Sequence, residues 1–158
     1  MRAVLICLLA LALSGCGGPT VDVAQGLQVV DVASGWFDLG IVDGKNKLVP
    51  SIAFKLKNVS DQTLRVLQAN AIFRRVGDPM EWGDGFRMVA RSEGLVAGAT
   101  SELVTVDSQQ GYTGSEARAD MLKNTQFVDA EVEIFAKYGS AQWKAIGKFT
   151  ISRQLLTR

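Results

Sequence analysis

The chain contains no histidine and only two cysteines, Cys7 and Cys16. Without histidine there is no imidazole for a Ser/His or Cys/His catalytic pair, or for a zinc site of the usual kind. No serine stands three residues before a lysine, so another common pattern of exported hydrolases is also missing. A domain that begins after Cys16 has no disulfide, and its core must supply its stability. These absences argue against an enzyme and predict no cofactor.

Neither sign of charge dominates the sequence. It has 17 lysine and arginine residues against 16 aspartate and glutamate residues, a formal net charge of +1. A nucleic-acid-binding protein typically gathers its basic residues into a patch or stripe, and this chain shows no such cluster. The charge balance therefore predicts that nucleic acid is not a partner.

A long apolar run occurs only at the N-terminus. Arg2 precedes an uninterrupted apolar stretch from Ala3 to Leu13. A bilayer-spanning helix needs roughly 20 residues, so this stretch is too short to span but suits the apolar region of an export signal. The stretch closes with Leu13-Ser14-Gly15-Cys16. This tetrapeptide resembles the lipobox of bacterial lipoproteins.

The lipobox resemblance implies that residues 1–15 are a lipoprotein signal peptide, removed by cleavage between Gly15 and Cys16. It also implies diacylglycerol on the Cys16 sulfur and a third acyl chain, such as palmitate, on the new amino group. Two or three acyl chains anchor a protein stably, whereas one chain binds a membrane only marginally. Gly17, not aspartate, follows the cysteine, which in enteric-type sorting implies the outer membrane, facing the periplasm. The alternative is a secretory signal with an incidental cysteine.

The rest of the chain is the length of one domain. No apolar segment after Cys16 is long enough to cross a bilayer, so the membrane contact is expected to be through the acyl chains alone. Residues 16–26 begin with Gly17-Gly18-Pro19 and are predicted to be a lipidated N-terminus and flexible tether. Residues 27–158 are predicted to fold as a single domain.

The remaining pattern is that of an all-β protein. Apolar residues alternate with polar ones over residues 52–57, and again in two runs at 128–138 and 143–151 that predict a hairpin. Asp43-Gly44 predicts a turn. Over Leu64–Phe73 both faces are apolar, which leaves a central strand and a β-bulge as alternatives. We predict an immunoglobulin-like antiparallel β-sandwich of about seven strands.

One short helix is expected near residues 114–123. Thr113 and Glu116 have the spacing of a capping box, and Ala117, Met121 and Leu122 form a small apolar stripe behind them.

Two segments resemble FxLYD-type and related bacterial immunoglobulin-like domains. The first is Phe54-Lys55-Leu56-Lys57-Asn58-Val59-Ser60 with the strand that follows it, and the second is Ala97-Gly98-Ala99-Thr100 before Leu103–Val106. The chain departs from that family in having no Leu-Tyr-Asp sequence. The resemblance implies a fold and an exported context, but it implies no particular activity.

Aromatic residues in the irregular segments are the candidate partner-binding residues, namely Trp82, Phe86 and Tyr112. Exposed aromatic side chains in loops are typical of recognition surfaces. The alternative is that Trp82 and Phe86 fold back to cap one end of the sandwich, and that Tyr112 is buried.

Asp78, Glu81 and Asp84 supply carboxylates in the same irregular segment. They are weak candidates for a metal site, because their spacing does not follow the order of a known calcium loop. An ordinary turn cluster is the alternative, and Glu81 with Asp84 could instead be a catalytic carboxylate pair.

We therefore predict a non-catalytic envelope lipoprotein that binds or supports another cell-envelope component, an envelope protein partner, through loops at one end of the sandwich. Two alternatives stay open. One is a periplasmic module that binds a small ligand or a metal ion, and the other is a small hydrolase.

Overall fold

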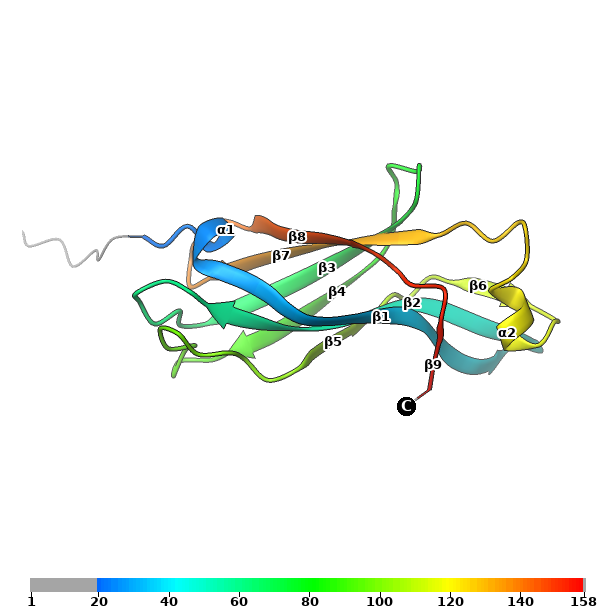
Figure 1. Ribbon diagram of the computed structural model, residues 1–158, viewed down its shortest axis with the longest axis horizontal. Helices are drawn as coiled ribbons and strands as arrows, with labels where there is room; N and C mark the ends of the chain where they lie inside the picture. Colours follow the sequence, from blue (N-terminus) through cyan, green and yellow to red (C-terminus); the bar gives the residue numbers. More distant parts are fainter. Residues whose placement is uncertain (1–19, 158) are drawn as a thin grey trace, which may run out of the picture.

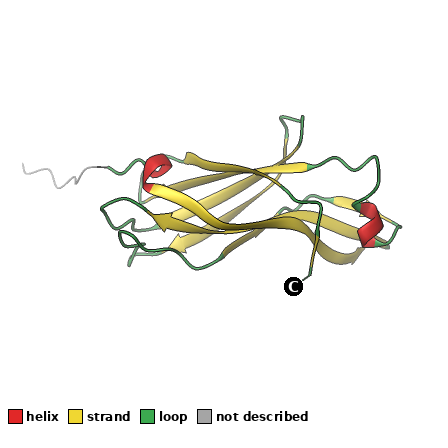
Figure 2. Cartoon of the chain, in the orientation of Figure 1, coloured by secondary structure: helices red, strands yellow, loops and turns green. Residues whose placement is uncertain are grey.

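The computed structural model describes residues 20–157, which form two β-sheets packed face to face (Figures 1 and 2). The first sheet contains β1 (Leu27–Val42), β2 (Lys45–Asn58), β5 (Val104–Asp107), β6 (Tyr112–Gly114) and β9 (Leu155–Leu156). The second sheet contains β3 (Leu67–Arg75), β4 (Glu81–Ala90), β7 (Ala130–Tyr138) and β8 (Lys144–Thr150). The helices are α1 (Val23–Gly26) and α2 (Arg118–Met121). The predicted signal peptide, Cys16 and the first part of the tether lie outside the described residues.

The strand order is β5-β2-β1-β9 in the first sheet, with β6 also paired to β2, and β4-β3-β7-β8 in the second. Neighbouring strands are antiparallel except β1 and β9. This arrangement confirms the predicted all-β sandwich. The strands described number nine instead of about seven, because the short β6 and β9 extend the first sheet alongside β2 and β1.

The predicted turns and hairpins are present. Asp43 and Gly44 have φ angles of 51° and 75°, so the β1–β2 turn uses two residues in the left-handed region. The closing hairpin pairs β7 with β8. On its outer face, Lys148 Nζ lies 2.8 Å from Glu131 Oε1. Opposite charges on facing strands thus meet as the sequence pattern predicts.

The expected helix at 114–123 is much shorter than predicted. Residues Tyr112–Gly114 pair with β2 as β6, so the sheet takes the backbone hydrogen bonds that a helix start would need. The helix begins only after Ala117, which makes no side-chain cap, so Thr113 and Glu116 form no capping box. Both helices span four residues, and no helix of residues 20–157 is long and apolar enough to cross a membrane.

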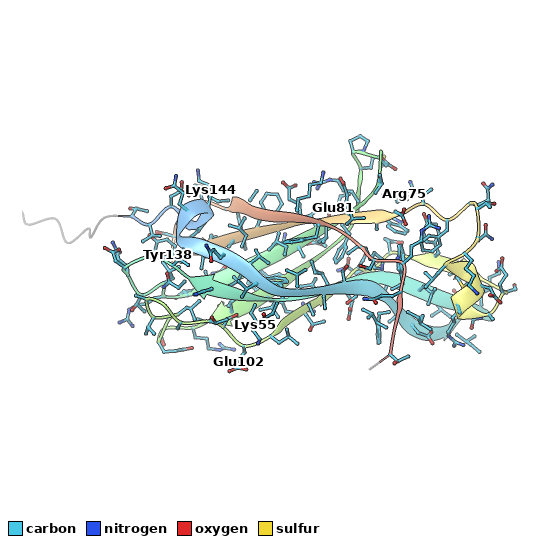
Figure 3. The ribbon with its side chains drawn as sticks, viewed as in Figure 1. Lys55, Arg75, Glu81, Glu102, Tyr138 and Lys144 are labelled. Carbon is cyan, nitrogen blue, oxygen red and sulfur yellow. The ribbon has the colours of Figure 1, made fainter. Side chains whose placement is uncertain are left out.

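The tether predicted to extend to Gly26 ends earlier. Val21 donates its backbone N–H to the hydroxyl of Tyr138 over 2.7 Å, and Val23 and Gly26 are buried. Asp22 caps α1 by accepting from the N–H of Ala24. Tyr138 and α1 lie together at one end of the molecule (Figure 3). Residues 21–26 therefore belong to the folded domain, because an apolar side chain within them completes the core.

The sandwich closes along the neighbouring edges of β4 and β5. The side-chain amide of Gln109 pairs with the backbone of Asp84 as a residue on a neighbouring strand would. Its oxygen accepts from the N–H of Asp84 over 3.1 Å, and its nitrogen donates to the C=O of Asp84 over 2.5 Å. Arg87 Nε donates to the carbonyl of Thr105 over 2.9 Å. Glycine on the inner side of β4 permits this approach, since a Cβ built at Gly85 would lie 2.3 Å from Val106 Cγ1.

Replacing Gly85 with alanine should force β4 and β5 apart at this edge. We expect Gly85→Ala to lower the free energy of unfolding by about 1–3 kcal/mol, the usual cost of overpacking, as measured by urea denaturation. Val106→Ala removes the methyl groups that the new Cβ would meet. The double variant should therefore lose less stability than the sum of the single variants. Strict additivity would contradict this account of the edge.

Candidate functional site

Four aromatic rings meet inside the sandwich near the α2 end. Trp36 of β1 is fully buried, and its ring centroid lies 4.5 Å from Phe127, 5.6 Å from Tyr112 and 6.1 Å from Trp82. Tyr112 also lies 4.6 Å from Phe127 and 5.0 Å from Trp82. These separations are those of favourable tilted and edge-to-face ring pairs. We call these four residues the aromatic cluster.

A β-bulge directs Trp82 into this cluster. Phe73 pairs with Gly83 and Arg74 pairs with Glu81, which leaves Trp82 as an extra residue on β4. A bulge of this kind bends the strand locally and re-aims one side chain. The guanidinium of Arg75 lies over the Trp82 ring, 5.8 Å from its centroid.

Arg153 fixes the segment that carries Phe127. Its guanidinium donates to the carbonyls of Phe127 and Leu122 over 2.9 and 3.2 Å, and lies 5.1 Å from the Phe127 ring centroid. Nε donates to Asp129 Oδ1 over 2.5 Å, and this hydrogen bond raises the pKa of Arg153. A charged residue near the C-terminus thus orders the loop before β7.

A cavity of about 280 Å³ lies beside the aromatic cluster. Its lining contains both apolar and polar side chains, from Tyr112, Thr113, Gly114, Glu116, Met121, Asn124, Gln126 and Phe127. Glu116 contributes the single carboxylate, which accepts a long hydrogen bond of 3.4 Å from Asn124 Nδ2. Among residues 20–157 no lysine or arginine forms an ion pair with Glu116. The cavity therefore offers aromatic surface, two amides and a carboxyl group that has no ion-pair partner among the described residues.

Two contacts to the β1–β2 hairpin position the α2 wall of the cavity. Asn46 Nδ2 donates to the carbonyl of Glu116 over 2.7 Å, and Arg118 forms an ion pair with Asp38. Partial burial raises the pKa of Asp38, but the hydrogen bonds from Arg118 and from the N–H of Gly40 outweigh it. The net effect is a pKa below the usual range.

The structure brings together two of the three predicted partner-binding residues. Trp82 and Tyr112 are half-buried and touch within the aromatic cluster. Trp82 therefore folds inward, whereas Phe86, which the capping alternative paired with it, does not. The Tyr112 hydroxyl donates to the carbonyl of Val128 over 3.2 Å. Phe86 lies elsewhere, on the outer face of the second sheet, where it is 49% exposed and its ring centroid is 6.4 Å from that of Trp143.

The three candidate metal ligands do not form a site. Asp78 accepts from the N–H of Met80 and pairs with Arg75 over 2.8 Å, and these two contacts lower the pKa of Asp78. Glu81 and Asp84 lie on β4, beyond the turn that holds Asp78. Within residues 20–157 no three acidic side chains are grouped so that they could hold a metal ion.

The sequence analysis did not single out Trp36 and Phe127. No local signal could identify them, because Trp36 meets partners at positions 82, 112 and 127, which only the packing of the two sheets brings near. Gly111, just before β6, is the one local signal for the close approach of this segment to β2. A Cβ at this position would lie 2.0 Å from the Leu48 carbonyl oxygen, so only glycine fits.

Comparisons with known proteins identify no family for this chain. No protein-family model matches it, and no curated protein does. Among solved structures it is similar to the X-ray structure of Northeast Structural Genomics Consortium target SoR45, with 13% sequence identity and a TM-score of 0.47. That match covers 83% of this chain and 89% of the other.

Trp82→Ala and Phe86→Ala are matched variants within β4 that separate a structural from an exposed ring. Trp82→Ala removes two ring contacts from the cluster and should cost about 2–4 kcal/mol of stability. Phe86→Ala, on a half-exposed side chain, should cost less than about 1 kcal/mol. Chemical denaturation measures both. Equal costs would contradict the different placement of the two rings.

Asp38→Asn should change how stability depends on pH. Because the folded-state pKa of Asp38 is lowered, its ion pair stabilises the fold above the unfolded-state pKa near 4 and is lost as the pH falls through the folded-state value. We expect the stability difference between wild type and Asp38→Asn to be largest near pH 7 and to shrink below about pH 4. Thermal melts from pH 2 to 7 measure this difference. A difference that stays constant over that range would show that the ion pair contributes nothing.

Proposed function

We propose that this protein is a lipid-anchored, non-catalytic binding domain of the bacterial envelope that presents its α2 end to another envelope component. One observation carries the proposal. Thr20, the first described residue, lies at the α1 end of an elongated sandwich, and the cavity beside Tyr112 lies at the opposite, α2 end (Figure 1).

The short link between the domain and the predicted anchor decides which end of the sandwich would lie near the membrane. Cys16 and Thr20 are four residues apart, a distance of at most about 14 Å for an extended chain. Residues 21–26 are part of the domain and cannot lengthen this link. Because β1 alone has 16 residues, the sandwich is about 50 Å long, and its α2 end lies about that far from its α1 end. A lipidated Cys16 would therefore hold the α1 end at the membrane and leave the α2 end free.

The cavity supplies the binding chemistry at the free end. At about 280 Å³ it is near the lower limit for ligand pockets, a size that suits one side chain or one ring of a larger partner. The Tyr112 ring offers an apolar wall, and Glu116, Asn124 and Gln126 offer hydrogen-bonding groups. This set favours a partner group that has an apolar face and donates hydrogen bonds to a carboxylate.

The same cavity favours a small-ligand module as the second candidate. A hydrolase based on two carboxylates has less support, because Glu116 is the one carboxylate in the lining and Glu81 and Asp84 lie outside it. A small ligand would raise the melting temperature of the purified protein by mass action, whereas a protein partner would be captured in cells.

Photo-crosslinking in cells tests the proposal. A photoreactive residue at Gln126, which is exposed and lines the cavity, should yield one discrete protein product, identified by mass spectrometry. The same residue at Lys57, exposed on β2 of the first sheet, is the control and should yield none. Glu116→Gln keeps the shape of the cavity but removes its charge, and should lower the yield from position 126 several-fold.

Cys16→Ser in the same cells tests the anchor separately. The variant should move from the membrane fraction to the soluble envelope fraction. Retention on the membrane would refute lipid anchoring at Cys16. Products of equal yield from positions 126 and 57, or none from either, would refute binding through the α2 end.

A further inference from the structure

The outer face of the β4-β3-β7-β8 sheet carries exposed rings outside the site described above. In one row across this face the register places Phe86, Asn70, Phe135 and Ala145 on successive strands. Phe86 is 49% exposed, and the neighbouring Met88 and Trp143 are 40% and 39% exposed. Exposed apolar side chains that are contiguous in this way are typical of an interaction surface. We call this row and its two neighbours the aromatic row.

The two rows nearer the α2 end are charged, with both signs present. One row runs Asp84, Ile72, Glu133 and Lys148 from β4 to β8. The next runs Glu81, Arg74, Glu131 and Thr150. Within the chain, Arg74 pairs with Glu133 over 3.3 Å and Lys148 with Glu131 over 2.8 Å. The face therefore carries charges of both signs beside its apolar part.

A polar atom at the centre of this face is incompletely satisfied. Asn70 Oδ1 is shielded from solvent and has no hydrogen-bond partner within residues 20–157. Asn70 lies between Phe86 and Phe135 in the aromatic row. Atoms of the same chain already shield Oδ1, so its missing hydrogen bond is an internal cost of packing on this face.

We propose that a second copy of this chain packs against this face, with the two-fold axis parallel to the strands and both α1 ends on the same side. This axis places β4 of one copy over β8 of the other, and β3 over β7. At the centre of this contact the rings of Phe86 and Trp143, whose centroids lie 6.4 Å apart within one chain, pack against the same two rings of the second copy. Position 86 of one copy then lies across from position 145 of the other.

The same axis brings opposite charges together. Asp84 on β4 faces Lys148 of the second copy, and Arg74 on β3 faces Glu131 of the second copy. These two pairs make the face complementary to itself in charge, as an isologous two-fold contact requires.

The size of the face sets the expected strength. Four strands about 4.8 Å apart and about seven residues long cover roughly 450 Å², which is less than the roughly 800 Å² per partner of a standard stable complex. A weak dimer in solution is expected, and it would strengthen where the chains are concentrated on a surface. The common direction of the α1 ends permits both copies to share one membrane, although the contact itself does not depend on lipidation.

Thiol cross-linking of the full chain tests this geometry, because Cys7 and Cys16 are the only natural cysteines. Two tagged copies, one carrying Phe86→Cys and the other Ala145→Cys, are expressed together and treated with a short bis-maleimide. The mixed pair should give a cross-linked dimer. Phe86→Cys alone should not, because the two β4 strands are offset by three strand spacings, about 14 Å. Wild type reports any linkage through Cys16, and Lys57→Cys on β2 paired with Ala145→Cys controls for random collision.

Sedimentation of purified full-length protein provides the second measurement. Phe86→Glu should lower the association constant at least ten-fold while the chain stays folded, as a cooperative melting curve would show, since the side chain is half-exposed. Leu103→Glu replaces an exposed leucine away from this face, 57% exposed, and should leave association unchanged. Cross-linking of Phe86→Cys with itself, equal yields from the Lys57→Cys pair, or monomeric wild type with no mixed product would each overturn the proposal. None of these results bears on binding at position 126.

Discussion

The arrangement of the α2 end depends on the packing of other aromatic rings against the buried side chain of Trp36. Its ring is fully buried between the two sheets, and it touches rings from β4, from β6 and from the loop before β7. Each of these segments joins the cluster through a different device: a bulge directs Trp82, pairing with β2 places Tyr112, and Arg153 holds the loop of Phe127. Two of the residues placed in this way, Tyr112 and Phe127, also line the cavity.

The two ends of the sandwich are built differently, and this supports the proposed division of labour. At the α1 end, Val21 and Val23 are drawn into the domain, which leaves little chain between the fold and Cys16. At the α2 end, a short strand and a four-residue helix enclose a partly polar cavity. If Cys16 is lipidated as proposed, the length of the sandwich and not a long tether would set how far the α2 end lies from the membrane. The wide outer face of the second sheet lies between the two ends, so a contact there leaves both of them free (Figure 1).

Much of the fold was predictable because the patterns that specify it are local. Alternation over residues 128–138 and 143–151 predicted β7 and β8, and Asp43-Gly44 predicted the first turn. Of the two alternatives for Leu64–Phe73, the structure shows a central strand, because β3 lies between β4 and β7. Val66, with a φ of 52°, interrupts the extended backbone, so β3 begins at Leu67 and not at Leu64. The helix prediction failed because a capping pattern reports only a local preference, and the pairing of β6 with β2 overrode it.

By itself the sequence determined the all-β class, the main hairpins and the charge pairing across β7 and β8, since each follows from residues close together along the chain. It also determined the features that predict export and lipidation. Only the tertiary structure decided that Trp82 and Tyr112 share a buried cluster while Phe86 faces outward, because a bulge reverses the side-chain alternation of β4. It likewise decided that Glu116 lines a cavity and that Asp78 is occupied by Arg75. The positions of these side chains depend on how the two sheets and their connections pack, and that packing cannot be deduced from the spacing of residues along the chain.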